Sequence, residues 1–231
     1  MQFERFFVMV IGFVLKNVFY KAKLFLVYLF GFLMLSKFAF AVGFAEDPIE
    51  RFKIGSDNAP VTFYMFFSLS CTHCADLHAN TFELIKKNYI DKGLVKMVFI
   101  DLPMGGDMVA LAHAMLYAAD KSSERLDLMD MYFKNQQYWL LNNSPQSAIV
   151  SYAKISGLDV DKVEKTLVNK DFLKKLIDSS LIYVKKLGIN GTPFMVISKG
   201  KNISVKEDKK LSGALPYEKI ATELDEFLKK K

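Results

Sequence analysis

The spacing of apolar residues predicts a strand, a helix and a second strand in the first half of the chain. The unbroken apolar run Val61–Phe67 is typical of a buried strand. Apolar residues then recur at helical spacing to about Asp91, and Gly93 is expected to close that helix. The run Leu94–Ile100 is the next predicted strand. Two strands that flank a helix at this spacing form a βαβ unit, so we expect them to pair in parallel.

From Gly105 to about Leu187 the periodicity is helical throughout. The helical segments are Met108–Ala119, Ser123–Trp139, Pro145–Ser156, Leu158–Asn169 and Asp171–Lys186. Asp161 and Asp171 are expected at helix starts, because their side-chain oxygens can accept an unpaired backbone N–H. This much helix inside a small α/β unit predicts an inserted helical subdomain. The insertion either only packs on the sheet or also forms one wall of a substrate groove.

The end of the chain reads as a hairpin followed by a helix. Phe194–Ser198 is a predicted strand, Lys199–Asn202 a turn, and Ile203–Lys206 the antiparallel partner. Tyr217–Lys230 is an amphipathic helix with one apolar face. Near the start, Glu46–Ile54 contains a short possible edge strand.

The first forty-odd residues are strongly apolar in two blocks, Phe6–Leu15 and Leu24–Leu35. Each block is shorter than the ~20 residues that cross a bilayer. Lysines precede the second block and an Ala-x-Ala sequence follows it, which predicts an export signal cleaved after Ala41. The alternative is an uncleaved anchor that uses Leu24–Ala45. Both readings place the rest of the chain outside the cytoplasm, where disulfides form and persist.

Composition and charge narrow the class of protein. The chain has 231 residues, of which 52% are apolar, which suits one medium domain with an insertion. Its formal charge is +6, but residues 1–41 contribute +4 of this, and the remainder carries only +2. No basic stripe interleaved with aromatic residues remains, so the sequence does not indicate a nucleic-acid surface.

The chain has two cysteines, Cys71 and Cys74, and they enclose Thr72 and His73 at the predicted junction of strand and helix. The free N–H groups and the positive dipole end of a helix start favour an anion. We therefore expect the pKa of Cys71 to lie below the ~8.5 of a free thiol, with His73 as a second positive group nearby. Cys71 is the candidate nucleophile and Cys74 its buried partner, because a disulfide at such a site passes readily to another dithiol.

Two other roles for the cysteine pair are less well supported. A static disulfide across a two-residue loop constrains the unfolded chain little. A zinc site needs about four ligands, and only three histidines remain as candidates. His73 lies inside the loop between the cysteines, and His78 and His113 have no recognisable ligand spacing. We interpret His78 as a packed core histidine. A redox role is favoured, and it needs no metal or organic cofactor.

Four stretches together resemble the DsbA family of thioredoxin-fold oxidoreductases. They are Gly-Ser-Asp-Asn-Ala-Pro-Val-Thr at 55–62, Phe-Ser-Leu-Ser-Cys-Thr-His-Cys at 67–74, Gly-Thr-Pro-Phe at 191–194 and Ser-Gly-Ala-Leu-Pro-Tyr at 212–217. The match runs from about Glu50 to the C-terminus, and it is specific because distant motifs occur in the right order.

The resemblance implies an α/β thioredoxin fold with an inserted all-helical subdomain. After a signal peptide or membrane anchor at 1–41, residues 46–104 would form the first part of the fold with the CxxC motif. Residues 105–187 would form the helical insertion, and residues 188–231 the second part with a cis-proline loop.

The resemblance also implies roles for single residues. The Thr192–Pro193 bond would be cis, and Thr192 would present its backbone to a substrate peptide. Thr72 departs from the family's usual proline, so the redox potential of the family does not carry over. Met65 stands where the family commonly has a buried acid that takes a proton from the second thiol. Proton transfer would then use water or another group, for example Glu83 or Asp101.

The resulting hypothesis is a periplasmic oxidoreductase that introduces disulfide bonds into unfolded or partly folded exported proteins. Its active residues would be Cys71, Thr72, His73 and Cys74, and a membrane redox partner would reoxidise the site. One alternative is a disulfide isomerase or reductase, because a threonine before the proline, here Thr192, also resembles the isomerase branch of the fold. Another is an envelope protein that keeps the fold only to bind peptides.

Overall fold

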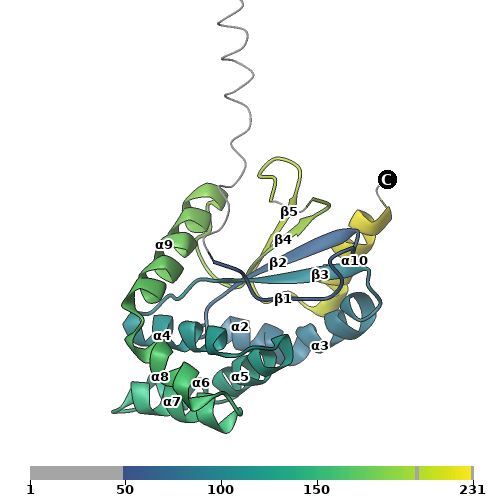
Figure 1. Ribbon diagram of the computed structural model, residues 1–231. Coiled ribbons are helices and arrows are strands. Elements are labelled where there is room, and N and C mark those ends of the chain that lie inside the picture. Colours follow the sequence, from purple (N-terminus) through teal and green to yellow (C-terminus); the bar gives the residue numbers. More distant parts are fainter. Residues whose placement is uncertain (1–48, 201–202, 230–231) are drawn as a thin grey trace, which may run out of the picture. The chain divides into compact units, whose positions relative to one another are not determined.

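A five-stranded mixed sheet in the order β1-β3-β2-β4-β5 organises the protein (Figure 1). The computed structural model describes residues 49–200 and 203–229. The predicted leader, residues 1–41, lies outside the described residues. Within the described residues, no helix combines the length and apolar character needed to span a membrane.

The central strand β2 (Val61–Phe67) is buried along its whole length. It pairs in parallel with β3 (Val95–Asp101), as the βαβ pattern predicts, and antiparallel with β4 (Phe194–Ser198). A strand covered on both faces carries mainly apolar residues on both, which explains why its sequence does not alternate; Thr62 is its one small polar residue.

The sheet ends in two short edge strands. β1 (Lys53–Ile54) pairs antiparallel with β3, and β5 (Lys209–Ser212) pairs antiparallel with β4. The prediction of a strand at Ile203–Lys206 is wrong. There the Ser204 N–H donates to the Asp208 carboxylate at 2.6 Å, and the Asp208 N–H donates back to the Ser204 carbonyl at 3.2 Å. This local turn uses the backbone groups that a ladder would need, so pairing begins after it.

The helix after β2 is continuous in direction but changes its winding. It comprises α2 (Thr72–Leu77), the π-helical turn η1 (His78–Phe82), α3 (Glu83–Ile85) and the π-helical turn η2 (Lys86–Ile90). Its buried face includes Cys74, Leu77, Phe82, Ile85 and Tyr89. Gly93 follows with a φ of 70°, a conformation that favours glycine at a helix end.

The helical insertion follows β3 and lies largely beside α2 in Figure 1. Its helices are α4 (Asp107–Met115), the 3₁₀ turn η3 (Leu116–Ala118), α5 (Ser122–Lys134), α6 (Gln136–Leu140), α7 (Pro145–Ile155), α8 (Val160–Val168) and α9 (Lys170–Leu187).

Two details of the insertion differ from the sequence prediction. The single helix predicted for 123–139 is interrupted at Asn135, which separates α5 from α6. The capping residues of α8 and α9 are Asp159 and Asn169, whose side chains accept backbone N–H groups, rather than Asp161 and Asp171. The true caps lie two residues earlier, so the predicted ones fall inside the first turn of each helix.

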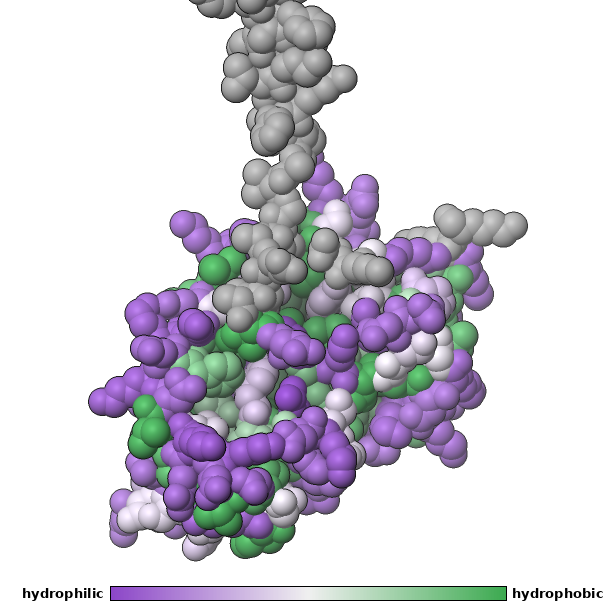
Figure 2. Space-filling model, in the orientation of Figure 1, coloured by the Kyte–Doolittle hydropathy of each residue, from purple (hydrophilic) through white to green (hydrophobic). Residues whose placement is uncertain are grey.

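The sheet, the α2 helix and the insertion share one apolar core. Phe67 of β2, Leu77 of α2 and Phe133 of α5 belong to the same buried cluster. The last helix, α10 (Tyr217–Lys229), adds Ile220, Leu224 and Phe227 to it. On the face shown in Figure 2, hydrophilic side chains dominate and apolar residues form separate patches.

Candidate active site

The chain turns sharply between β2 and α2, and this turn places Cys71 at the helix start. The Cys71 N–H donates to the Ser68 carbonyl at 3.1 Å. Cys71 itself is extended, and its carbonyl accepts the N–H groups of Cys74 and Ala75 at 3.1 Å each. Cys71 is therefore the N-cap of α2, as the sequence pattern predicts.

The two cysteines differ in exposure. Both are free thiols; Cys71 is half-buried, and Cys74 is only 3% exposed. The Cys71 Sγ lies 3.2 Å from the Thr192 carbonyl oxygen, across 121 positions of sequence. The Thr192–Pro193 peptide bond is cis, as the resemblance implies. The fold thus brings the two motifs, Cys71–Cys74 and Thr192–Pro193, into contact.

Hydrogen bonds around Cys71 favour its thiolate. The bond from the Cys74 thiol is the largest cause, and the pKa of Cys71 is lowered from 9.0 to about 5. Burial opposes the shift, while the Thr192 side chain and the backbone N–H groups of Cys74 and His73 support it. The N–H groups at a helix start are efficient partners for an anion because the helix dipole places positive charge at the same end.

The same pair of sulfurs has the opposite effect on the second cysteine. The hydrogen bond to Cys71 and then burial raise the pKa of Cys74 well above its ordinary value. The shared proton therefore stays on Cys74, and Cys71 carries the negative charge. This asymmetry is what the predicted role of Cys71 as nucleophile requires, and a thiolate of low pKa also leaves readily from a disulfide.

The two residues between the cysteines both face solvent. Thr72 is exposed at the first position of α2. The His73 side chain is 72% exposed, and its Nδ1 lies 3.9 Å from an Asp76 carboxylate oxygen. His73 favours the Cys71 thiolate through its backbone N–H. A positive contribution from its imidazole stays a prediction.

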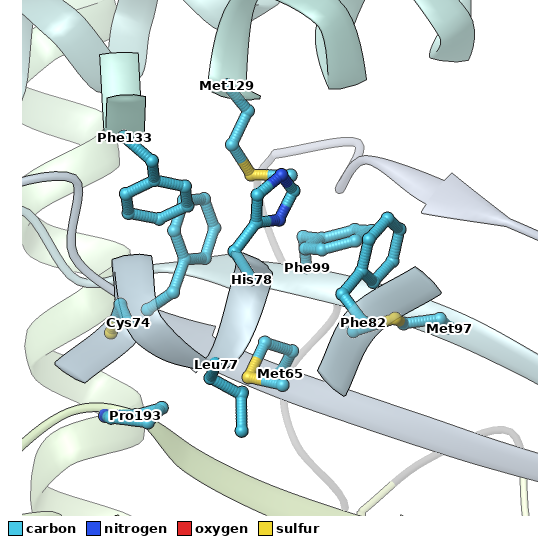
Figure 3. A pocket seen from close by; sticks show the side chains of 11 residues that line it. Met65, Cys74, Leu77, His78, Phe82, Met97, Phe99, Met129, Phe133 and Pro193 are labelled. Atoms are coloured by element: carbon cyan, nitrogen blue, oxygen red, sulfur yellow. The ribbon is translucent and has the colours of Figure 1, made fainter. Parts of the chain in front are cut away.

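An apolar cavity lies directly beside Cys74 (Figure 3). Its volume is about 20 Å³, enough for a single water molecule. Met65, His78 and Pro193 line it together with Cys74 and aromatic side chains. Met65, which replaces the family's usual acid, thus occupies part of the wall next to the buried thiol.

The two carboxylates suggested as substitutes for that acid are placed elsewhere. Glu83 is exposed on α3. Asp101 is buried, but its carboxylate accepts hydrogen bonds from Arg51, His113 and Tyr117. Neither residue lines the cavity beside Cys74.

His78 also lines that cavity, and it is packed against Phe82, as the sequence interpretation expects. Its ring stacks on Phe82 with centroids 5.0 Å apart, and its Nε2 lies 3.7 Å from an Asp130 oxygen. Burial lowers the pKa of His78, and the charge of Asp130 opposes this. The spacing of four residues from Cys74 was the available signal, because such residues share a helix face. Within the described residues, no cluster of three or more His, Cys, Asp or Glu side chains could hold a metal ion.

Comparison with known proteins agrees with this geometry. The sequence profile of the family described as Thioredoxin matches residues 48–216. The chain belongs to the thioredoxin family. The matched region includes the Cys71–Cys74 motif and the Thr192–Pro193 loop, so both halves of the site lie within it.

Curated relatives of the chain are named for disulfide bond formation, and solved structures share its fold. It is 28% identical over 151 residues to a disulfide bond formation protein D of Bacillus cereus, covering 63% of this chain and 68% of that protein. Disulfide bond formation protein D of Bacillus subtilis is 25% identical over 185 residues, covering 77% of each. The crystal structure of Wolbachia pipientis alpha-DsbA1 superposes with a TM-score of 0.70 at 23% identity, covering 78% of this chain and 91% of that one. The enzyme class follows from these matches together with the paired thiols.

Proposed function

We propose that this protein is a thiol oxidase that introduces disulfide bonds into exported proteins through Cys71 and Cys74. The observation that carries the proposal is the placement of Cys71 as the N-cap of α2, beside the buried Cys74 and 3.2 Å from the Thr192 carbonyl, and the lowered pKa of Cys71, about 5, agrees with it. A stabilised Cys71 thiolate favours the reduced pair, and a protein whose reduced form is stabilised is a strong oxidant.

The reaction begins with the Cys71–Cys74 disulfide. A substrate thiolate attacks the Cys71 sulfur, the bond to Cys74 breaks, and Cys74 leaves and takes up a proton because its pKa is raised. A second substrate thiolate then attacks the substrate sulfur of the mixed disulfide, and Cys71 leaves as a thiolate. The substrate loses two electrons and gains a disulfide, and the enzyme holds the two electrons as one thiol and one thiolate.

Substrate would bind along the Thr192–Pro193 loop. The Thr192 carbonyl is 3.2 Å from the Cys71 sulfur, so a peptide that pairs with this backbone would have its own sulfur beside Cys71. Backbone pairing of this kind is indifferent to side chains, which suits an enzyme that acts on many unfolded or partly folded chains.

We place the protein in the periplasm, released by cleavage after Ala41 or held at the inner membrane by Leu24–Ala45. The basic and apolar pattern of residues 1–41 supports export. Each turnover leaves the enzyme reduced, so a membrane redox partner must remove two electrons. The chain needs no metal or organic cofactor for the exchange itself.

The test is the equilibrium of the Cys71–Cys74 pair with glutathione buffers. We expect a reduction potential near the ~−120 mV of a strong oxidant, and a value near the ~−270 mV of thioredoxin would make the protein a reductase. Cys71→Ala supplies the control for binding without chemistry. An envelope protein that only binds peptides would keep its peptide affinity in this variant and would have no oxidase activity to lose.

A further inference from the structure

The backbone of Leu69 is held on both sides by the helical insertion. Leu69 is fully buried in the turn between β2 and Cys71. Its N–H donates to His113 Nε2 at 2.9 Å, and its carbonyl accepts from Gln136 Nε2 at 2.8 Å. His113 lies on α4 and Gln136 begins α6, and both side chains are buried. Two helices of the insertion thus fix one residue of the loop that carries the redox site.

The hydrogen bonds also fix the tautomer of His113. A backbone N–H can only donate, so Nε2 of His113 is the acceptor and the ring proton is on Nδ1. Nδ1 donates to an Asp101 oxygen at 2.8 Å. Arg51, at 2.9 Å, and Tyr117 donate to the other Asp101 oxygen. Burial raises the pKa of Asp101, but these donors together lower it below its ordinary value. An ionised, fully bonded carboxylate therefore orients the imidazole.

The position of Leu69 controls the residues around both sulfurs. The neighbouring Ser68 carbonyl accepts the Cys71 N–H at 3.1 Å, and this bond fixes where α2 begins. The Ser68 backbone also favours the thiolate form of Cys74. The N–H groups of His73 and Cys74 stabilise the Cys71 thiolate only if the helix start is held in this orientation. A shift at Leu69 would move all of these groups together.

We propose that His113 and Gln136 are positioning residues of the redox site, which stabilise the Cys71 thiolate by holding the backbone of Leu69. The inference deepens the proposed function and rests on it. The insertion then has a chemical role besides packing. Releasing either bond lets the turn relax, so the pKa of Cys71 rises and the disulfide becomes harder to reduce.

The experiment compares four variants of the full-length protein. His113→Phe removes the acceptor for Leu69, and Gln136→Met removes the donor while keeping the side-chain length. His113→Gln can place its Oε1, which accepts hydrogen bonds, near the position of Nε2 and serves as the conservative rescue. Tyr132→Phe is the matched control, because the buried Tyr132 hydroxyl donates to a backbone carbonyl, that of Ile149, at 3.0 Å within the insertion but away from the loop.

Two quantities are measured for each variant, the equilibrium constant with glutathione and the pKa of Cys71 from its thiolate absorbance. We expect His113→Phe and Gln136→Met each to shift the equilibrium constant with glutathione toward the disulfide by about threefold to tenfold, which is the effect of one net hydrogen bond. Each variant should also raise the pKa of Cys71. His113→Gln should return both toward the wild-type values. Tyr132→Phe should lower the unfolding midpoint and leave both unchanged.

Wild-type values in both His113→Phe and Gln136→Met would overturn the inference, and so would an equal shift in Tyr132→Phe. If His113→Phe does not fold, Gln136→Met alone decides, because it disturbs only one bond. The glutathione equilibrium uses no substrate protein. Failure of the wild type to oxidise a reduced, unfolded protein would therefore refute the proposed function and not the positioning roles.

Discussion

The ionisation of Cys71 is the property of this site that can be tested most directly. The hydrogen bond from Cys74 is the largest cause of its low pKa, about 5 compared with 9.0 for an ordinary thiol. A hydrogen bond to a charged group is worth ~1.5–3 kcal/mol, and one pKa unit is ~1.36 kcal/mol, so this single bond accounts for about 1–2 units. Cys74→Ala should raise the pKa of Cys71 by that amount.

The magnitude also decides the assay. At neutral pH a thiol of pKa about 5 is almost fully ionised, a gain of roughly 100-fold in thiolate over a pKa of 9.0. Intrinsic nucleophilicity falls with a slope of ~0.4–0.5 per pKa unit, which over this shift is a loss of roughly 60-fold. The two effects nearly cancel, so the reaction rate at neutral pH is a poor measure. The ultraviolet absorbance of the thiolate, titrated in the reduced protein with the oxidised protein subtracted, reports the pKa itself.

Cys74→Ser is the matched control, because its hydroxyl can still donate to the Cys71 sulfur. We expect its titration to stay close to that of the wild type, while Cys74→Ala moves upward and remains below 9.0 through Thr192 and the helix-start N–H groups. A wild-type midpoint near 8.5–9, the range of a free thiol, would refute the reasoning. An identical midpoint in Cys74→Ala would show that another group lowers the pKa.

Three further predictions concern stability and processing. Because folding lowers the pKa of Cys71, its thiolate stabilises the reduced protein fully above pH 9.0, and this stabilisation is lost as the pH falls to about 5. The melting temperatures of the reduced and oxidised forms should therefore converge as the pH falls through this window. A constant difference between them would contradict the lowered pKa. Asp101→Asn should lower the free energy of unfolding in urea by about 3–5 kcal/mol, because it removes the carboxylate charge that faces the buried Arg51 guanidinium, whereas Asp57→Asn, at an exposed pair, should change nothing measurable. N-terminal sequencing of the mature protein should begin at Val42; a sequence beginning at Met1 would establish the uncleaved anchor.

Elements that depend on local patterns follow directly from the order of residues along the chain. The run Val61–Phe67, apolar except for Thr62, is a central strand, because a segment with apolar residues on both faces is stable only where both faces are covered. The position of Cys71 at a helix start also follows locally, from a strand that ends just before a helical pattern begins. These two facts already predict a reactive thiolate.

Local patterns failed where two local structures competed. Ser204 and Asp208 close a turn on themselves, and this bond displaces the predicted strand from Ile203–Lys206 to Lys209–Ser212. Periodicity does not record such side-chain to backbone bonds. The sequence pattern also did not predict that the helix is interrupted at Asn135, because the apolar spacing continues through this residue.

The groups that surround the two sulfurs come from distant parts of the sequence, and their positions follow from the tertiary structure. Thr192 reaches Cys71 across 121 positions, and Gln136 reaches Leu69 across 67. His113 stands in a helix rich in alanine, leucine and methionine, where its sequence context gives no sign of its partner. Such contacts depend on how helices pack on the sheet, and packing is set by the whole core. The sequence therefore predicts the reactive pair, and the fold decides what holds and tunes it.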